Sequence, residues 1–158
     1  MQIRMASLKD KLVFDATMRH HSEKNSVNLK GKKASKDEAG WFEEVLTKPM
    51  YCNGIECECE GCLFDVDIFV IYDRLDTVGY FIASYDEEEA EIEYCTTPQY
   101  VGKGYGDRII DLGMIYTQRL RPQIAYFRAD CVNDASKDLC LRAGFAKGIC
   151  GDYFFYID

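Results

Sequence analysis

The fold is decided by Pro98-Gln99-Tyr100-Val101-Gly102-Lys103-Gly104-Tyr105-Gly106. An extended run enters this stretch and a long amphipathic run leaves it, which predicts a strand, a glycine-rich loop and a helix in direct succession. Its glycines let the backbone come close to a ligand, and the N–H groups at the start of a helix attract negative charge. The stretch therefore predicts an anion-binding site.

The chain before this loop predicts strands and two helices. Strand-like runs cover residues 64–72, 78–85 and 91–97, and their short links favour an antiparallel meander. A strand over 2–6 and helices over 8–21 and 36–47 are expected nearer the N-terminus, with the adjacent His20 and His21 at a solvated helix end. The inward faces are expected to carry Leu12, Val13, Ala16 and the stem of Arg19 in the first helix, and Trp41, Phe42, Val45 and Leu46 in the second.

The chain after the loop predicts a parallel crossover followed by a second, shorter helix. The helix that leaves the loop ends before Pro122, and a strand over 123–132 returns parallel to the meander. Asn133 is a good N-cap for a helix over 134–143, Gly144 suits its end, and strands over 145–150 and 153–157 close the chain. The face of the first of these helices is expected to carry Tyr105, Ile109, Leu112, Tyr116 and Leu120.

These elements predict an α+β fold, a mixed and mostly antiparallel central sheet flanked by helices in the order β-α-α-β-β-β-α-β-α-β-β. With 158 residues, 47% of them hydrophobic, we expect a single domain over 1–158. The sequence contains no apolar run of membrane-spanning length and no export signal, so a cytoplasmic protein without membrane contact is expected. The net charge of −8 argues against nucleic acid as a partner.

The eight cysteines allow a metal hypothesis. Cys52, Cys57, Cys59 and Cys62 have a spacing that could hold zinc. Three glutamates interleave with these thiols, and they would add repulsion to a tetrathiolate site that already carries negative charge. We therefore expect reduced thiols and no metal, and elemental analysis of the purified protein would test this.

A second motif joins the loop about thirty residues later: Asn133-Asp134-Ala135-Ser136-Lys137-Asp138-Leu139-Cys140-Leu141-Arg142-Ala143-Gly144-Phe145. Together the two motifs resemble the GNAT superfamily of acyl-CoA-dependent N-acyltransferases, across essentially the whole chain. The resemblance implies a GNAT-like fold and acetyl-CoA as co-substrate. It also implies a pyrophosphate loop made of Val101, Gly102, Lys103, Gly104, Tyr105 and Gly106, although Val101 stands where the family usually has a polar residue.

The resemblance implies further contacts and one departure. Backbone groups of Tyr94, Cys95, Thr96 and Thr97 would contact the pantetheine arm, and Asn133, Ser136 and Lys137 would lie near the cofactor. The family often has a tyrosine four residues before its Gly-Phe pair, where it protonates the departing thiolate. This chain has Cys140 there, so Cys140 is the expected acid, with Tyr100, Tyr105 and Tyr153 as alternatives.

A general base is also expected, because removing a proton from an alkylammonium with a pKa of about 10.4 costs roughly 4 kcal/mol near neutral pH. Alternation along residues 91–97 puts Glu91, Glu93 and Cys95 on one strand face, where two carboxylates could raise each other's pKa. The resemblance places the base at Glu91, with Glu93 second. The alternative is that both glutamates lie on a solvated strand face.

Two classes of function remain open at this stage. The first is an N-acetyltransferase in which a primary amine attacks the thioester directly in a ternary complex. The second is a non-catalytic acyl-CoA-binding or zinc-regulated module on the same fold. The amine acceptor, a small molecule or a peptide, is not encoded in any one stretch, and a homodimer is compatible with the sequence.

Overall fold

The computed structural model describes residues 1–23, 40–47 and 65–158. The predicted order of strands and helices is confirmed within them. The elements are β1 (Gln2–Met5), α1 (Lys11–Glu23), α2 (Trp41–Thr47), β2 (Val66–Asp73), β3 (Asp76–Asp86), β4 (Glu89–Thr96), α3 (Gly106–Leu120), β5 (Tyr126–Ala129), α4 (Asp134–Arg142), β6 (Ala146–Lys147) and β7 (Tyr153–Tyr156), with short 3₁₀ helices at Leu8–Asp10 and Pro98–Tyr100.

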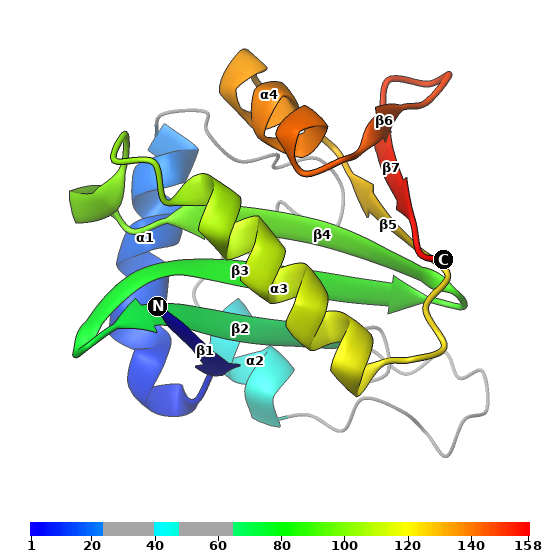
Figure 1. Cartoon of the computed structure of the whole chain (residues 1–158). Helices are drawn as coiled ribbons and strands as arrows, with labels where there is room; N and C mark the ends of the chain where they lie inside the picture. The colour runs from blue at the N-terminus through cyan, green and yellow to red at the C-terminus, as the bar shows by residue number, and fades with distance from the viewer. Residues whose placement is uncertain (24–39, 48–64) are drawn as a thin grey trace.

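The strands form one seven-stranded sheet in the order β1-β2-β3-β4-β5-β7-β6 (Figure 1). Every neighbouring pair is antiparallel except β4 and β5, which run parallel because α3 carries the chain back between them. The predicted meander and the predicted crossover are both confirmed.

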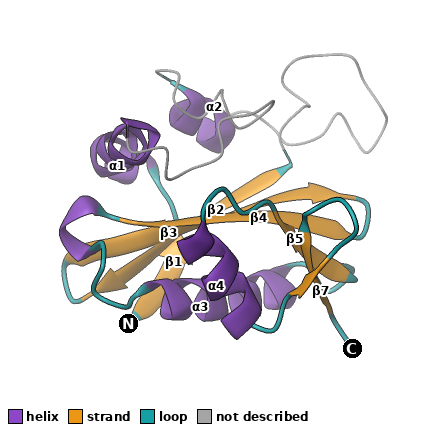
Figure 2. Ribbon diagram, turned by 90° about the horizontal axis from the view of Figure 1, so that it is seen from above, coloured by secondary structure: helices purple, strands orange, loops and turns teal. Residues whose placement is uncertain are grey.

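Helices cover the two faces of this sheet: α1 and α2 lie on one side, and α3 and α4 lie on the other (Figure 2). Each face has its own core. Phe69, Phe81, Ile92 and Phe127 pack under α3, whereas Tyr80, Ile82 and Cys95 pack against Phe14 and Phe42 from the other helices. Because both faces are covered, β2 is buried along six consecutive residues, all of them apolar except Asp67, a pattern typical of the middle of a layered sheet.

The inward face of α1 differs from the expected one. Leu12, Val13, Ala16 and Arg19 are all exposed, with Leu12 exposed by 83%. The buried residues are instead Phe14, Thr17, Met18 and His21, which recur at the same helical spacing. The helix carries two overlapping apolar stripes, and packing selected the stripe that holds the large Phe14 ring, which contacts Trp41, Phe42 and Tyr80.

Several predicted boundaries were too generous. The strand predicted over 123–132 is only Tyr126–Ala129, and the one predicted over 145–150 is only Ala146–Lys147.

The buried face of α3 also differs from the predicted one. Its buried positions are Ile109, Ile110, Gly113, Met114 and Thr117, so the helix is rotated relative to the prediction and Leu120 is half exposed. The stretch containing Cys52, Cys57, Cys59 and Cys62 lies outside the described residues, as does the start of the helix predicted over 36–47.

Within the described ranges, none of the helices combines the length and the apolar character needed to cross a membrane.

Candidate active site

The site begins where β4 and β5 separate. The two strands pair from Glu89 and Tyr126 as far as Ile92 and Ala129, while β4 continues along β3 to Thr96. The N–H of Thr97 donates to the Val78 carbonyl of β3 at 2.8 Å. Because backbone direction alternates along a strand, the polar groups of Tyr94 and Thr96 face away from β3, toward the gap that β5 leaves. Beyond Ile92, no other strand in the described part of the chain pairs with β4 on this side.

The glycine loop follows directly and leads into α3. Gly102 and Gly104 have φ values of 77° and 83°, a left-handed conformation that glycine adopts without a steric penalty. A Cβ placed on either residue would meet no atom within 4 Å, so the space beside the loop is open. The first N–H groups of the fifteen-residue α3 have no intrahelical partner and point toward this loop.

Two contacts hold the loop in place. The Tyr100 hydroxyl donates to the Asp76 carboxylate at 3.1 Å, and the Thr97 hydroxyl donates to the Thr77 carbonyl at 2.8 Å. At the other end, the guanidinium of Arg142 on α4 donates to the Asp107 carboxylate in the first turn of α3 at 3.1 Å. This ion pair offsets the one negative charge at the start of α3, where an anion is expected to bind.

The second motif forms α4 as predicted. The Asn133 side chain accepts a hydrogen bond from the Ser136 N–H at 2.9 Å, which is an N-cap contact. Gly144 ends the helix with a φ of 97°, and Phe145 is buried in the core beneath α3. The second half of α4 lies against the start of α3, because Gly106 is close to the Leu139 methyl groups and Arg142 bonds to Asp107.

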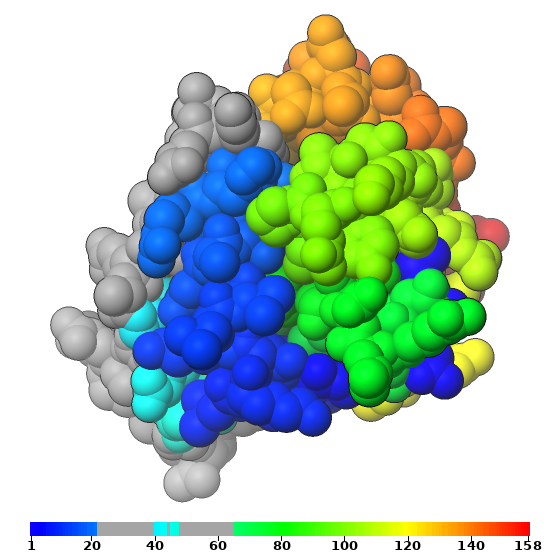
Figure 3. Space-filling view, turned by 90° about the vertical axis from the view of Figure 1, so that its left-hand side faces the viewer, coloured from blue at the N-terminus to red at the C-terminus, as the bar shows by residue number. Residues whose placement is uncertain are grey.

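Between these elements lies a cavity of about 460 Å³. It is lined by the end of β4, the glycine loop, the first turn of α3 and the exposed face of α4; Figure 3 shows α1 beside the loop, with α4 above them. The predicted cofactor-binding residues that line it are Tyr94, Cys95, Thr96, Val101, Gly102, Gly104, Tyr105, Gly106, Asn133 and Ser136. Thr97, Lys103 and Lys137 do not line it: the N–H of Thr97 is engaged by β3, and the ammonium of Lys103 lies over the Tyr100 ring.

His21 also lines this cavity, and its environment contradicts the predicted solvated helix end. The residue is only 7% exposed, and its Nε2 lies 2.6 Å from the Thr96 carbonyl oxygen on the free edge of β4. Burial lowers the pKa of His21, so the imidazole is neutral and its Nε2–H donates to that carbonyl. No local pattern distinguishes this histidine from the adjacent His20, because only the packing of α1 against β4 buries it.

Glu91 and Glu93 lie on the opposite side of β4 from Ile92. The strand is regular throughout, so the predicted alternation is confirmed, with Ile92 under α3 and Cys95 against α1 and α2. Neither glutamate lines the cavity. The Glu91 carboxylate accepts a hydrogen bond from Arg128 of β5 at 2.7 Å.

Arg128 also forms hydrogen bonds with two further carboxylates. Its guanidinium donates to Glu89 at 3.0 Å and to Asp152 at 3.4 Å. Burial alone would lower the pKa of Arg128, but its hydrogen bond to Glu89 and the neighbouring carboxylates raise it overall. Three carboxylates thus surround one guanidinium, which leaves an excess of negative charge on this face of the sheet.

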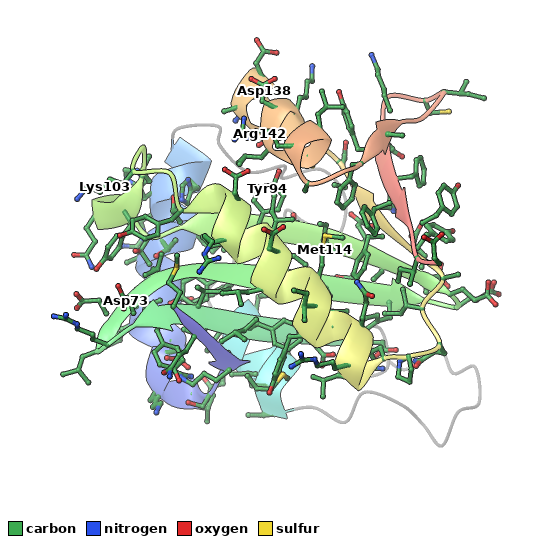
Figure 4. All side chains as sticks on the ribbon, in the orientation of Figure 1. Asp73, Tyr94, Lys103, Met114, Asp138 and Arg142 are labelled. Carbon is green, nitrogen blue, oxygen red and sulfur yellow. The ribbon has the colours of Figure 1, made fainter. Side chains whose placement is uncertain are left out.

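Cys140 is fully buried and does not line the cavity. Tyr94 lies between the cavity and Cys140, and it points from β4 toward α4 (Figure 4). Its hydroxyl donates a hydrogen bond to the Ser136 carbonyl at 3.1 Å and lies 3.4 Å from Cys140 Sγ. Cys131 Sγ is 3.3 Å from Cys140 Sγ on the far side. Of the alternative acids, Tyr100 and Tyr105 line the cavity, whereas Tyr153 is buried in the core.

The described residues contain no group of three or more histidine, cysteine or acidic side chains arranged to hold a metal ion.

Comparison with known proteins identifies the fold. No protein-family model matches the chain, and no curated protein sequence matches it. Solved structures do match over nearly the whole chain. An acetyltransferase from Salmonella typhimurium, solved with its cofactor acetyl-CoA, is 17% identical, with a TM-score of 0.71 over 100% of this chain and 94% of that one. The chain has the GNAT fold.

Two further GNAT structures show the same architecture. A spermidine N-acetyltransferase from Vibrio cholerae, in complex with coenzyme A and spermine, is 16% identical, with a TM-score of 0.68 over 98% of this chain and 94% of that one. A ribosomal-protein alanine acetyltransferase from Vibrio fischeri is 14% identical, with a TM-score of 0.69 over 99% and 93%. The GNAT fold predicted from the two motifs is thereby confirmed.

Proposed function

We propose that this protein is an acetyl-CoA-dependent N-acetyltransferase in which a primary amine attacks the thioester directly in a ternary complex. The observation that carries the proposal is the continuous cavity that joins the free edge of β4 to the glycine loop and the start of α4. The whole of residues 1–158 would act as one domain.

The residues around the cavity fit coenzyme A from end to end. N–H groups at the start of α3 and the open backbone beside Gly102 and Gly104 suit a pyrophosphate. The pantetheine arm carries amides, which suit the backbone groups of Tyr94 and Thr96 that face away from β3, although His21 already occupies the Thr96 carbonyl. The structures solved with acetyl-CoA or coenzyme A share this fold, which also supports acetyl-CoA as the acyl donor.

A primary amine is the acceptor that suits the rest of the site. The excess of carboxylates around Arg128 attracts a cation, and Glu91 and Glu93 lie on that face. Either glutamate would accept the ammonium proton, directly or through water. Arg128 competes with the amine for Glu91, so the two glutamates must be substituted one at a time to decide which of them is the base.

The test is acetyl transfer from acetyl-CoA to a panel of peptide N-termini, lysine peptides, polyamines and small amines. The chain has eight cysteines, so coenzyme A release should be followed chromatographically rather than with a thiol reagent. We expect one amine class to be acetylated. We also expect Glu91→Gln or Glu93→Gln to lower kcat by about 100-fold or more, with the Kd for acetyl-CoA unchanged.

Three other outcomes would count against parts of the proposal. Acetyl-CoA binding without transfer to any amine class would favour the non-catalytic acyl-CoA-binding module. Absence of acetyl-CoA binding would reject both functions. Full activity in both glutamine variants would reject the assignment of the base.

A further inference from the structure

A chain of hydrogen-bonding groups leads from the cavity toward solvent through the contact between β4 and α4. Tyr94 lines the cavity, and its hydroxyl lies 3.4 Å from Cys140 Sγ. Cys140 Sγ lies 3.3 Å from Cys131 Sγ, and Cys131, beyond the end of β5, is partly exposed. Three groups that can each give and take a proton therefore connect the cavity to the surface.

The order of these groups is decided by burial. Cys140 is 0% exposed, with Tyr94 on one side and Cys131 on the other. It therefore has no direct access to a ligand in the cavity, whereas Tyr94 lines the cavity. The thiol of Cys140 on α4 therefore lies behind the cavity wall, and Tyr94 of β4 lies between that thiol and the cavity.

The proposed acetyl transfer needs a proton at this place, because cleavage of the thioester leaves coenzyme A as a thiolate. We propose that Tyr94 is the catalytic residue that gives this thiolate its proton, and that Cys140 and Cys131 return a proton to Tyr94 from solvent. This inference rests on the proposed acetyl transfer and extends it by naming the acid and its relay.

The step balances without any oxidant or reductant. The amine nitrogen forms a bond to the acetyl carbon, and the carbon–sulfur bond breaks with its electron pair on sulfur. The Tyr94 O–H proton moves to that sulfur, the Cys140 S–H proton moves to the phenolate, and the Cys131 S–H proton moves to the Cys140 thiolate. Cys131 then takes a proton from water, while the ammonium proton of the acceptor leaves through the general base.

The acidities of the three groups explain why a relay is needed. A phenol with an ordinary pKa of about 10 is a poor donor to a thiolate whose conjugate acid has a pKa of about 8.5. Burial raises the pKa of Tyr94 further, and the nearby Cys140 adds to this effect. The hydrogen bond from Cys131 lowers the pKa of Cys140. Cys140 therefore reprotonates Tyr94 readily. The same hydrogen bond raises the pKa of Cys131, which keeps that thiol protonated as the next donor.

The first test compares Tyr94→Phe with the wild type, using acetyl-CoA and an accepted amine. The substitution removes one hydroxyl and keeps the ring and the strand backbone. We expect the single-turnover rate to fall by about 100-fold, the Kd for acetyl-CoA to stay within about twofold, and the solvent deuterium isotope effect to decrease. Tyr85→Phe is the matched control, because its buried hydroxyl bonds to Asp67 instead, and its rate should equal that of the wild type.

The second test separates proton relay from packing at position 140. Cys140→Ser keeps a group that can pass a proton, whereas Cys140→Ala does not. We expect the serine variant to retain most of the rate and the alanine variant to lose about tenfold, although both leave a smaller side chain. In the free protein, Tyr94→Phe should also raise the pKa of Cys140, followed by thiolate ultraviolet absorbance, because one hydrogen-bond partner is lost.

The outcomes separate this inference from the proposed function. A wild type that transfers acetyl groups, with Tyr94→Phe equally fast and with an unchanged isotope effect, would overturn the relay and leave the acetyltransferase standing. Equal rates for Cys140→Ser and Cys140→Ala would overturn the role of the thiol even if Tyr94→Phe does not fold. A wild type that binds acetyl-CoA without transferring its acetyl group would overturn the proposed function itself, and the relay with it.

Discussion

The residues that matter most at this site owe their properties to neighbours far away in the sequence. His21 is neutral because α1 buries it against Thr96 of β4, and Glu91 is held by Arg128, which lies in another strand. Tyr94 and Cys140 are 46 positions apart, yet their side chains are in contact. Their residue types suggest chemistry, but only these contacts decide which group can carry it out.

His21 leads to a prediction about stability and pH. Burial lowers its pKa below the ordinary value of 6.5, so below about pH 6.5 the unfolded chain binds more protons than the folded one. The free energy of unfolding should therefore decrease as the pH falls from about 6.5 toward the lower folded pKa, by about 1.4 kcal/mol for each unit of lowering. Urea unfolding at a series of pH values measures this slope.

The matched control is His21→Gln, whose amide N–H can still donate to the Thr96 carbonyl but does not titrate. We expect this variant to lose the slope that His21 causes below about pH 6.5. Asp10 does not contribute to this slope, because it is already ionised there. Burial raises its pKa, but its hydrogen bonds, chiefly those with Arg4, hold the pKa below the ordinary value of 3.8. An identical slope in the two proteins would exclude His21 as its source.

Among the elements, α3 does most to build the site. Its N-terminus supplies the free N–H groups at the loop, and its middle packs on β3 so closely that no side chain fits at Gly113. A Cβ at Gly113 would overlap the Phe81 ring. This close approach sets how far α3 stands from the sheet, and with it the position of the glycine loop.

Gly113→Ala should therefore destabilise the protein, although alanine is the better helix former by about 1 kcal/mol. Overpacking against the buried Phe81 ring costs about 1–3 kcal/mol and outweighs that gain. Chemical denaturation measures the difference. Gly106→Ala is the comparison, because its Cβ would meet only the terminal methyl groups of Leu139, and it should lose less stability. A Gly113→Ala variant as stable as the wild type would show that α3 can move away from β3.

For the molecule as a whole, the cavity lies where the end of β4, the glycine loop, α3 and α4 meet beside one core. The end of β4 belongs to the sheet, whereas the glycine loop, α3 and α4 converge on it from outside the sheet (Figure 1). A ligand that bridges them binds only the folded chain. Its binding free energy therefore adds to the free energy of unfolding.

If the proposed function is right, acetyl-CoA at about 100 times its Kd should stabilise the protein by about 2.7 kcal/mol, measured as a rise in Tm. Pantetheine at the same concentration should give a much smaller rise, because it lacks the pyrophosphate that the glycine loop would bind. Equal rises with the two ligands would contradict a pyrophosphate site at Gly102 and Gly104.

The sequence by itself determined the elements whose signals are local. Glycines at 102, 104 and 106 mark a loop between strand and helix, Asn133 and Gly144 mark the two ends of α4, and short links favour an antiparallel meander. Backbone geometry and capping depend on a few adjacent residues, so the fold and most of the cavity lining could be predicted. The two motifs together also indicated the fold family.

Only the tertiary structure decided which faces are buried and which side chains meet. Helix α1 carries two apolar stripes of similar strength, and the fit of the Phe14 ring among Trp41, Phe42 and Tyr80 selected the one that also buries His21. The contact between Tyr94 and Cys140 and the ion pair between Glu91 and Arg128 each join separate elements. Such contacts depend on how strands and helices pack in three dimensions, and no spacing along the chain encodes that packing.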